Sequence, residues 1–144
     1  MATTSPSPQT AERSKDLTGR VALVTGGTRG IGAAICRSLS SAGAVVGAGF
    51  SSNRERADEL RESIEADGGT LTLHQGNVGE WDDCQRVVHE VIDEHGRLDI
   101  LVNNAGVTVD RPVWKMSLDD WHKVLRVNQS GEFYMTKPAR VHIL

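Results

Sequence analysis

The sequence predicts an α/β protein built on a doubly wound parallel sheet with helices on both faces. Short β-rich runs alternate with longer segments of helical periodicity from Arg20 onward. The expected strands, at 21–25, 44–50, 70–75 and 98–104, are mostly continuous apolar runs, as strands covered on both faces are. Glycines at 43 and 68–69 end two of the helical segments. Because crossovers between parallel strands are right-handed, this alternation yields a doubly wound fold.

The composition indicates one ordinary domain. With 144 residues, 38% hydrophobic content and 24% charged content, the chain can bury one core but hardly two. A net charge of -3 without a basic block argues against a nucleic-acid partner, and no apolar run approaches the roughly 20 residues that span a membrane. Residues 1–16 are polar and contain two prolines, so we expect a disordered tail before a domain at 17–144.

Helical periodicity also predicts which side chains face the sheet, and these side chains form one apolar stripe on each expected helix. In the last helix, Ser117 is expected to cap the amino end, with Asp120 in the capping-box position. The two isolated cysteines suit buried positions in a reducing cytosol, and the five histidines show no metal-ligand spacing, so no metal site is expected. The apolar stripes, helix by helix, are Ile31, Ala34, Ile35, Leu39 and Ala42; Ala57, Leu60 and Ile64; Trp81, Cys84, Val88, Val91, Ile92 and His95; and Leu118, Trp121, Leu125 and Asn128.

A glycine loop, TGGTRGIG at 25–32, joins the first expected strand to the first helix. Gly26, Gly30 and Gly32 permit a sharp turn and leave room for a pyrophosphate against the backbone, while the helix N-terminus offers N–H groups to phosphate. No Lys-Ser/Thr follows, which excludes the phosphate loop of an ATPase. At this first strand–helix junction the loop indicates a dinucleotide site; the alternative is a tight turn with packing glycines.

The end of the second strand favours NADP(H) over NAD(H). An NAD site usually carries an acidic residue there for the ribose hydroxyls, but this segment has Ser51, Ser52, Asn53 and Arg54 before the first acid. Arg29 and Arg54 could flank a 2′-phosphate. The alternative is two solvated arginines on loops.

Together with NNAG at 103–106, the TGGTRGIG loop resembles the short-chain dehydrogenase/reductase family over residues 17–144. The resemblance implies the amino-terminal part of a Rossmann-type NADP-binding domain, with strand order 3-2-1-4. Asn77-Val78 stands where the family commonly has Asp-Val beside the adenine. The cofactor-binding residues implied by the loop, the strand ends and the resemblance are Gly26, Thr28, Arg29, Gly30, Ile31, Gly32, Ser52, Asn53, Arg54, Asn77, Val78, Asn104, Ala105 and Gly106.

Within that family the segments at 76–83 and 103–128 are similar to acetoacetyl-CoA reductases and 3-oxoacyl-carrier-protein reductases. This similarity implies a cytoplasmic oxidoreductase that uses NADPH to reduce a 3-oxoacyl thioester, with acetoacetyl-CoA as the first choice. A homotetramer is the expectation for the full-length family, not for this chain. The family's catalytic asparagine matches Asn128, which would help to hold a proton-relay water; the alternative is a core asparagine bonded to backbone.

The only tyrosine, Tyr134, does not fit the family's catalytic Tyr-x-x-x-Lys pattern. Lys137 follows it by three residues, Asn128 precedes it by six without an intervening strand, and Pro138 disfavours helical geometry at Lys137. We therefore expect Tyr134 to be a packing residue on the last helix. The competing hypothesis for the chain is a truncated, catalytically inactive cofactor-binding fragment that lacks the serine and the tyrosine–lysine pair.

Overall fold

The computed structural model describes residues 16–143, so the predicted tail at 1–16 lies outside the described residues except for Asp16. Four strands and their helices alternate along the chain, and a π-helical turn at Arg126–Ser130 joins the last two helices. The elements in chain order are β1 (Val21–Val24), α1 (Gly30–Ser41), β2 (Val45–Phe50), α2 (Arg54–Ala66), β3 (Leu71–Gln75), α3 (Trp81–His95), β4 (Ile100–Val102), α4 (Leu118–Leu125) and α5 (Gly131–Ile143).

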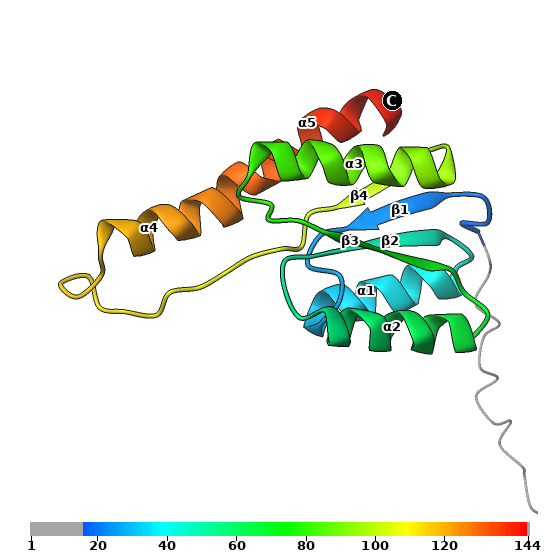
Figure 1. The fold of residues 1–144 in the computed structure, drawn as a ribbon, viewed down its shortest axis with the longest axis horizontal. Helices are drawn as coiled ribbons and strands as arrows, with labels where there is room; N and C mark the ends of the chain where they lie inside the picture. Colours follow the sequence, from blue (N-terminus) through cyan, green and yellow to red (C-terminus); the bar gives the residue numbers. More distant parts are fainter. Residues whose placement is uncertain (1–15, 144) are drawn as a thin grey trace, which may run out of the picture.

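The sheet has four parallel strands in the order β3-β2-β1-β4, which confirms the predicted fold class and strand order (Figure 1). Val21 pairs with Val45, and Ala22 pairs with Ile100. Because all four strands run in the same direction, their carboxyl ends lie along one edge of the sheet. The loops that carry the predicted site residues leave from that edge.

Helices α1 and α2 cover one face of the sheet, and α3 and α5 cover the other (Figure 1). The predicted stripe of α2, at Ala57, Leu60 and Ile64, is buried. Cys36 and Cys84 are also buried, one in each core, as expected for small apolar residues. Burial raises the pKa of Cys36 to about 12 and that of Cys84 to about 11, so both thiols are protonated and unreactive near neutral pH.

The predicted stripe of α1 is partly wrong. Ile31 is 75% exposed and Ala34 is exposed, whereas Gly32 and Cys36 are the buried residues of this helix. The first turn of α1 lies at the carboxyl edge of the sheet and borders a cavity, so a side chain at its start has no strand beneath it. In α3, Val87 adds to the predicted stripe as a buried residue.

Two predictions about the carboxyl-terminal helices also need correction. Leu118 and Trp121 do not face a core, because α4 extends away from the sheet and leaves them 77% and 54% exposed (Figure 1). Pro138 does not interrupt the helix, since α5 continues through it. Met135 and Ala139 of α5 are fully buried in the core beside α3, and this packing offsets the backbone hydrogen bond that proline removes.

The capping box at the start of α4 is confirmed. The Asp120 N–H donates to the Ser117 hydroxyl at 3.0 Å, and the Ser117 N–H donates to the Asp120 carboxylate at 3.2 Å. None of the described helices combines the length and the apolar character that crossing a lipid bilayer requires.

Candidate cofactor-binding site

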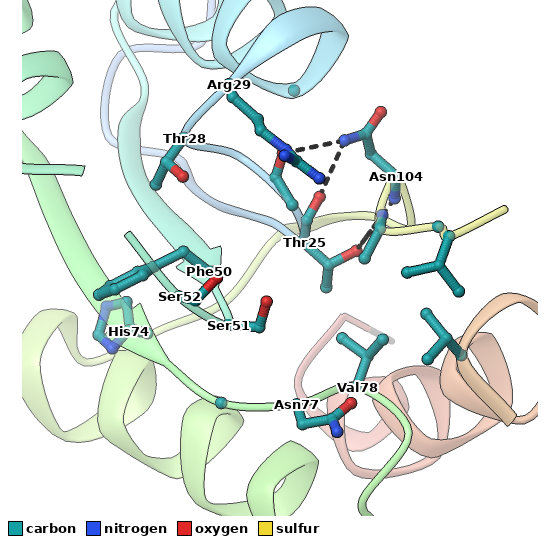
Figure 2. Close-up of a pocket in the computed structure, with 18 of the residues that line it drawn as sticks. Thr25, Thr28, Arg29, Phe50, Ser51, Ser52, His74, Asn77, Val78 and Asn104 are labelled. Carbon is teal, nitrogen blue, oxygen red and sulfur yellow. Dashed lines mark hydrogen bonds between the residues drawn. The ribbon is translucent and has the colours of Figure 1, made fainter. Parts of the chain in front are cut away.

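A cavity of about 610 Å³ opens at the carboxyl edge of the sheet, where the loops after all four strands meet (Figure 2). Its size is within the range of roughly 300–1,000 Å³ that is usual for small-molecule sites. Every residue predicted to bind the cofactor lines this cavity except Arg54. The remaining lining residues are Thr25, Gly49, Phe50, Ser51, Arg56, His74, Gly76, Asp83, Cys84, Val87, Val107, Lys123, Val127 and Met135.

The glycine loop approaches the loop after β4 so closely that two of its glycines have no room for a side chain. Gly26 has a φ of +60°, and a Cβ there would lie 3.0 Å from the Cα of Ala105. A Cβ on Gly32 would collide with the carbonyl oxygen of Gly26. Glycine at both positions therefore lets the loop pack directly against the NNAG segment and its own backbone at the rim of the cavity.

Thr25 connects the glycine loop to the NNAG segment. Its hydroxyl oxygen accepts hydrogen bonds from the N–H groups of Asn104 and Ala105, both at 3.0 Å. The Asn104 side-chain amide in turn donates to the carbonyl oxygens of Thr25 and Gly26, both at 3.1 Å (Figure 2). Thr25 is only 3% exposed, and it is not among the residues that the sequence predicts to bind the cofactor. The sequence feature that could have identified Thr25 is its hydroxyl, which ends the otherwise apolar run at 21–25.

The N-terminus of α1 has features that suit a phosphate. No side-chain oxygen caps this helix at Arg29, and its first three residues line the cavity. The unpaired N–H groups and positive dipole end of a helix attract anions. Arg29 lines the same region and is exposed, so its charge adds to that of the helix.

The loop after β2 places its arginines differently from the prediction. The Arg54 guanidinium lies 5.8 Å over the Phe50 ring, and its Nε is 3.4 Å from Asp58, so Arg54 does not line the cavity. Arg56 does line the cavity, and its backbone N–H donates to the Asn53 side-chain oxygen at 3.1 Å. Asn53 has a φ of 64° and caps α2. A binding role for Arg54 stays a prediction, and Arg56 is an additional candidate that was not predicted from the sequence.

The charge of the lining favours an anionic ligand. Three cationic side chains, Arg29, Arg56 and Lys123, border the cavity, whereas Asp83 is the only carboxylate among its described lining residues. The Asp83 carboxylate accepts a hydrogen bond from the Asn77 N–H at 2.8 Å. The residues present therefore fit a phosphate-bearing dinucleotide.

Asn128 lies behind the cavity wall. Its side chain accepts from the Val107 N–H and donates to the Val107 carbonyl, both at 2.8 Å. Val107 lines the cavity, whereas Asn128 does not, so Asn128 fixes the backbone of a cavity loop. This pairing is the backbone-bonded arrangement considered as an alternative; the proton-relay role stays a prediction.

Tyr134 lies outside the cavity lining and packs on the α3 side of the sheet. Its ring centroid is 5.7 Å from that of Trp81, in an edge-to-face arrangement. Lys137 also contacts this aromatic group, with its Nζ 5.6 Å from the Trp81 ring centroid. The pair acts in packing in this structure, as the sequence analysis expected of Tyr134.

Comparison with known proteins agrees with this geometry. Residues 20–143 match the short chain dehydrogenase family. The chain is 43% identical to the acetoacetyl-CoA reductase of Rhizobium meliloti, in an alignment that includes 83% of this chain. It is 39% identical to the 3-oxoacyl-[acyl-carrier-protein] reductase of Synechocystis, in an alignment that includes 84% of this chain. It covers 47% and 49% of those two proteins, so the chain spans about half the length of the curated relatives it matches.

Solved structures give the same picture. A short chain dehydrogenase from Burkholderia cenocepacia in complex with NADP superposes with a TM-score of 0.85 at 37% identity. That match covers 88% of this chain and 52% of the Burkholderia chain. A dehydrogenase/reductase from Sinorhizobium meliloti superposes with a TM-score of 0.87 at 33% identity.

Proposed function

The chain belongs to the short-chain dehydrogenase/reductase family, and from this premise we propose that its cavity binds NADP(H) in preference to NAD(H). The observation that carries the proposal is the lining: Arg29 and Arg56 flank the glycine loop and the end of β2, with no carboxylate at that strand end. An NAD site usually places a carboxylate there for the ribose hydroxyls. The NADP complex of the Burkholderia relative supports the choice.

In this proposal each part of the cavity holds one part of the cofactor. The glycine loop from Gly26 to Gly32 and the N-terminus of α1 hold the pyrophosphate. Ser52, Asn53 and the arginines hold the phosphorylated ribose, and Asn77 and Val78 border the adenine. The NNAG loop, from Asn104 to Gly106, borders the ring that carries the hydride.

For the whole protein we propose NADPH-dependent reduction of a 3-oxoacyl thioester, with acetoacetyl-CoA as the first substrate to test. Support comes from relatives named for reductions of acetoacetyl-CoA and of 3-oxoacyl carrier protein. Bound NADPH supplies a hydride. The residues of this chain hold and orient the cofactor, and Asn128 fixes the loop at Val107 beside it. A cytoplasmic location and a homotetramer of the full-length protein belong to the same proposal.

A second candidate is cofactor binding without turnover by these 144 residues alone. Reduction of a ketone requires a proton donor near the hydride acceptor. Tyr134, the only tyrosine of the chain, packs on Trp81 and does not line the cavity. We expect no NADPH oxidation with acetoacetyl-CoA by the purified chain; turnover at an enzymatic rate that Tyr134→Phe abolishes would exclude this candidate.

Cofactor preference is tested by binding titrations of NADPH and NADH to the wild type and to three single variants. A charge-assisted hydrogen bond contributes about 1.5–3 kcal/mol, or roughly a tenfold to hundredfold change in affinity. We expect Arg29→Ala and Arg56→Ala to weaken NADPH binding by at least about tenfold while NADH binding stays within twofold. Arg54→Ala is the matched comparison, because it removes the same charge two residues away.

The three variants have distinct outcomes. If Arg54→Ala weakens NADPH binding and Arg56→Ala does not, the 2′-phosphate belongs to Arg54, as the sequence analysis expected. If all three variants weaken NADPH and NADH binding equally, the preference for NADP(H) is wrong.

A further inference from the structure

We propose that His74, Glu94 and His95 form a binding site for a divalent transition-metal cation, Zn²⁺ being the best match, between β3 and the last turn of α3. The donor atoms of these three side chains all lie within 4.8 Å of one another. The five histidines show no metal-ligand spacing along the chain, so the sequence predicts no metal site; His74 and His95 are 21 positions apart. Folding brings them together, since α3 crosses back over the strand that precedes it.

Both histidine donors lie close to the Thr72 hydroxyl, and the Glu94 carboxylate is near them. Nε2 of His74 is 3.8 Å from the Glu94 carboxylate, and the Thr72 hydroxyl lies 2.8 Å from that nitrogen and 3.0 Å from Nε2 of His95. Zinc binds imidazole nitrogen at about 2.0–2.1 Å, so tetrahedral ligand atoms are separated by about 3.4 Å. To bind zinc, the donor atoms would have to move from separations of up to 4.8 Å to about 3.4 Å, which requires the side chains to rotate about their χ angles. The Thr72 hydroxyl then turns aside or serves as a further oxygen donor.

A second carboxylate orients His74. Its Nδ1 is 3.0 Å from the Glu90 carboxylate, which also accepts from Arg86 at 2.6 Å. With the proton on Nδ1 held by Glu90, Nε2 is left with a free lone pair, on the side of the ring where the Thr72 hydroxyl and the Glu94 carboxylate lie. A carboxylate on the far nitrogen of a ligating histidine is the usual arrangement in protein metal sites.

The surroundings also provide space and access. His74 is only 2% exposed, whereas the Glu94 side chain is 53% exposed, which leaves a path from solvent to the donors. Gly47 on the neighbouring strand makes room for the imidazole, because a Cβ at that position would lie 3.2 Å from Cδ2 of His74. Two nitrogen donors and one carboxylate suit zinc and not magnesium or calcium, which prefer oxygen ligands alone.

Calorimetric titration of the chelator-treated chain with ZnCl2 tests the site. We expect one Zn²⁺ per chain in the wild type, no measurable binding of MgCl2, and a higher Tm with zinc, since a ligand of the folded state stabilises it. Glu94→Gln and His95→Asn should each weaken zinc binding by at least about tenfold. His89→Asn removes an exposed histidine of the same helix, is the matched control, and should leave zinc affinity unchanged.

Circular dichroism of each variant before the titration separates loss of binding from loss of fold, and Glu94→Gln changes only a half-exposed side chain. The absence of 1:1 binding in the wild type would overturn the proposal and leave a hydrogen-bonded His–Thr–His network. Zinc affinity that Glu94→Gln and His95→Asn leave unchanged would overturn it equally. The titration contains ZnCl2 and no NADPH, so its outcome is read separately from the proposed function, although His74 also lines the cofactor cavity.

Discussion

Replacing Thr25 by valine tests whether the hydroxyl, rather than the bulk, of this residue stabilises the site. Valine has nearly the same shape and keeps the buried methyl group, but it cannot accept the hydrogen bonds from the N–H groups of Asn104 and Ala105, both now 3.0 Å long. The two N–H groups would face an apolar side chain at a position where Thr25 is 3% exposed.

The expected loss can be worked from those two bonds. A buried donor without an acceptor costs about 1–3 kcal/mol. Asn104 and Ala105 are half-buried, so water reaches them in part and the low end applies. Two donors then cost about 2 kcal/mol of unfolding free energy. With a urea m-value of about 1–3 kcal/mol/M, the midpoint of unfolding should fall by about 1 M.

Thr25→Ser is the control. The order of unfolding stability among the wild type, Thr25→Ser and Thr25→Val shows whether the hydroxyl or the bulk of Thr25 matters more. Serine keeps the acceptor and loses one methyl group, worth about 0.8 kcal/mol. The hydrogen-bonding role therefore predicts that Thr25→Ser is more stable than Thr25→Val in urea unfolding followed by circular dichroism. If Thr25 acted only by packing, the order would reverse, because valine fills the space better. A valine variant as stable as the serine variant would refute the reasoning.

Two further substitutions test other parts of the fold. Hydrogen bonds from Arg97 at 2.7 Å and from the Val21 N–H at 2.8 Å hold the pKa of Asp99 at about 2, against 3.8 in a free side chain. Because the folded pKa is depressed, the stabilisation from the Asp99 carboxylate is present above about pH 4 and is lost as the pH falls through about 2. Asp99→Asn should lose about 1 kcal/mol at pH 7, after allowance for solvent screening, and only a small part of that at pH 2, where the folded carboxyl is half protonated, in urea titrations at both values. Gly47→Ala should cost about 1–3 kcal/mol through overpacking against His74, 3.2 Å from the new Cβ; a Tm equal to that of the wild type would show that the ring moves aside freely.

Local patterns predicted the backbone of this protein well. The four strands were expected within two residues of their observed ends, and the order β3-β2-β1-β4 matches the expectation. Apolar runs and helical periodicity are set by neighbouring residues, so they can be recognised without tertiary contacts. The capping box at Ser117 and Asp120 was likewise predicted, because both partners lie within one helical turn.

Predictions failed where an element's environment, rather than its own sequence, decided burial. Ile31 has the periodicity of a core residue but extends beyond the edge of the sheet, and Leu118 lies on a helix that points away from it. Pro138 has a strong local preference against helix, which burial of Met135 and Ala139 on the same helix overcame. Amphipathic periodicity identifies an apolar face but does not place a partner beneath it.

By itself, the sequence determined the fold class, because short-range periodicity separates strands from helices. The strand order was predicted through the family resemblance of the TGGTRGIG and NNAG motifs, and the residues predicted to bind a cofactor, except Arg54, do line one cavity. Only the tertiary structure decided that Arg56 rather than Arg54 lines the cavity, that Thr25 joins two loops 79 positions apart, and that the ring nitrogens of His74 and His95 lie within 4.8 Å of each other. Each of these facts depends on side chains that parallel strand pairing and helix packing bring together. Such distances are set by the whole fold and leave no periodic signal along the chain.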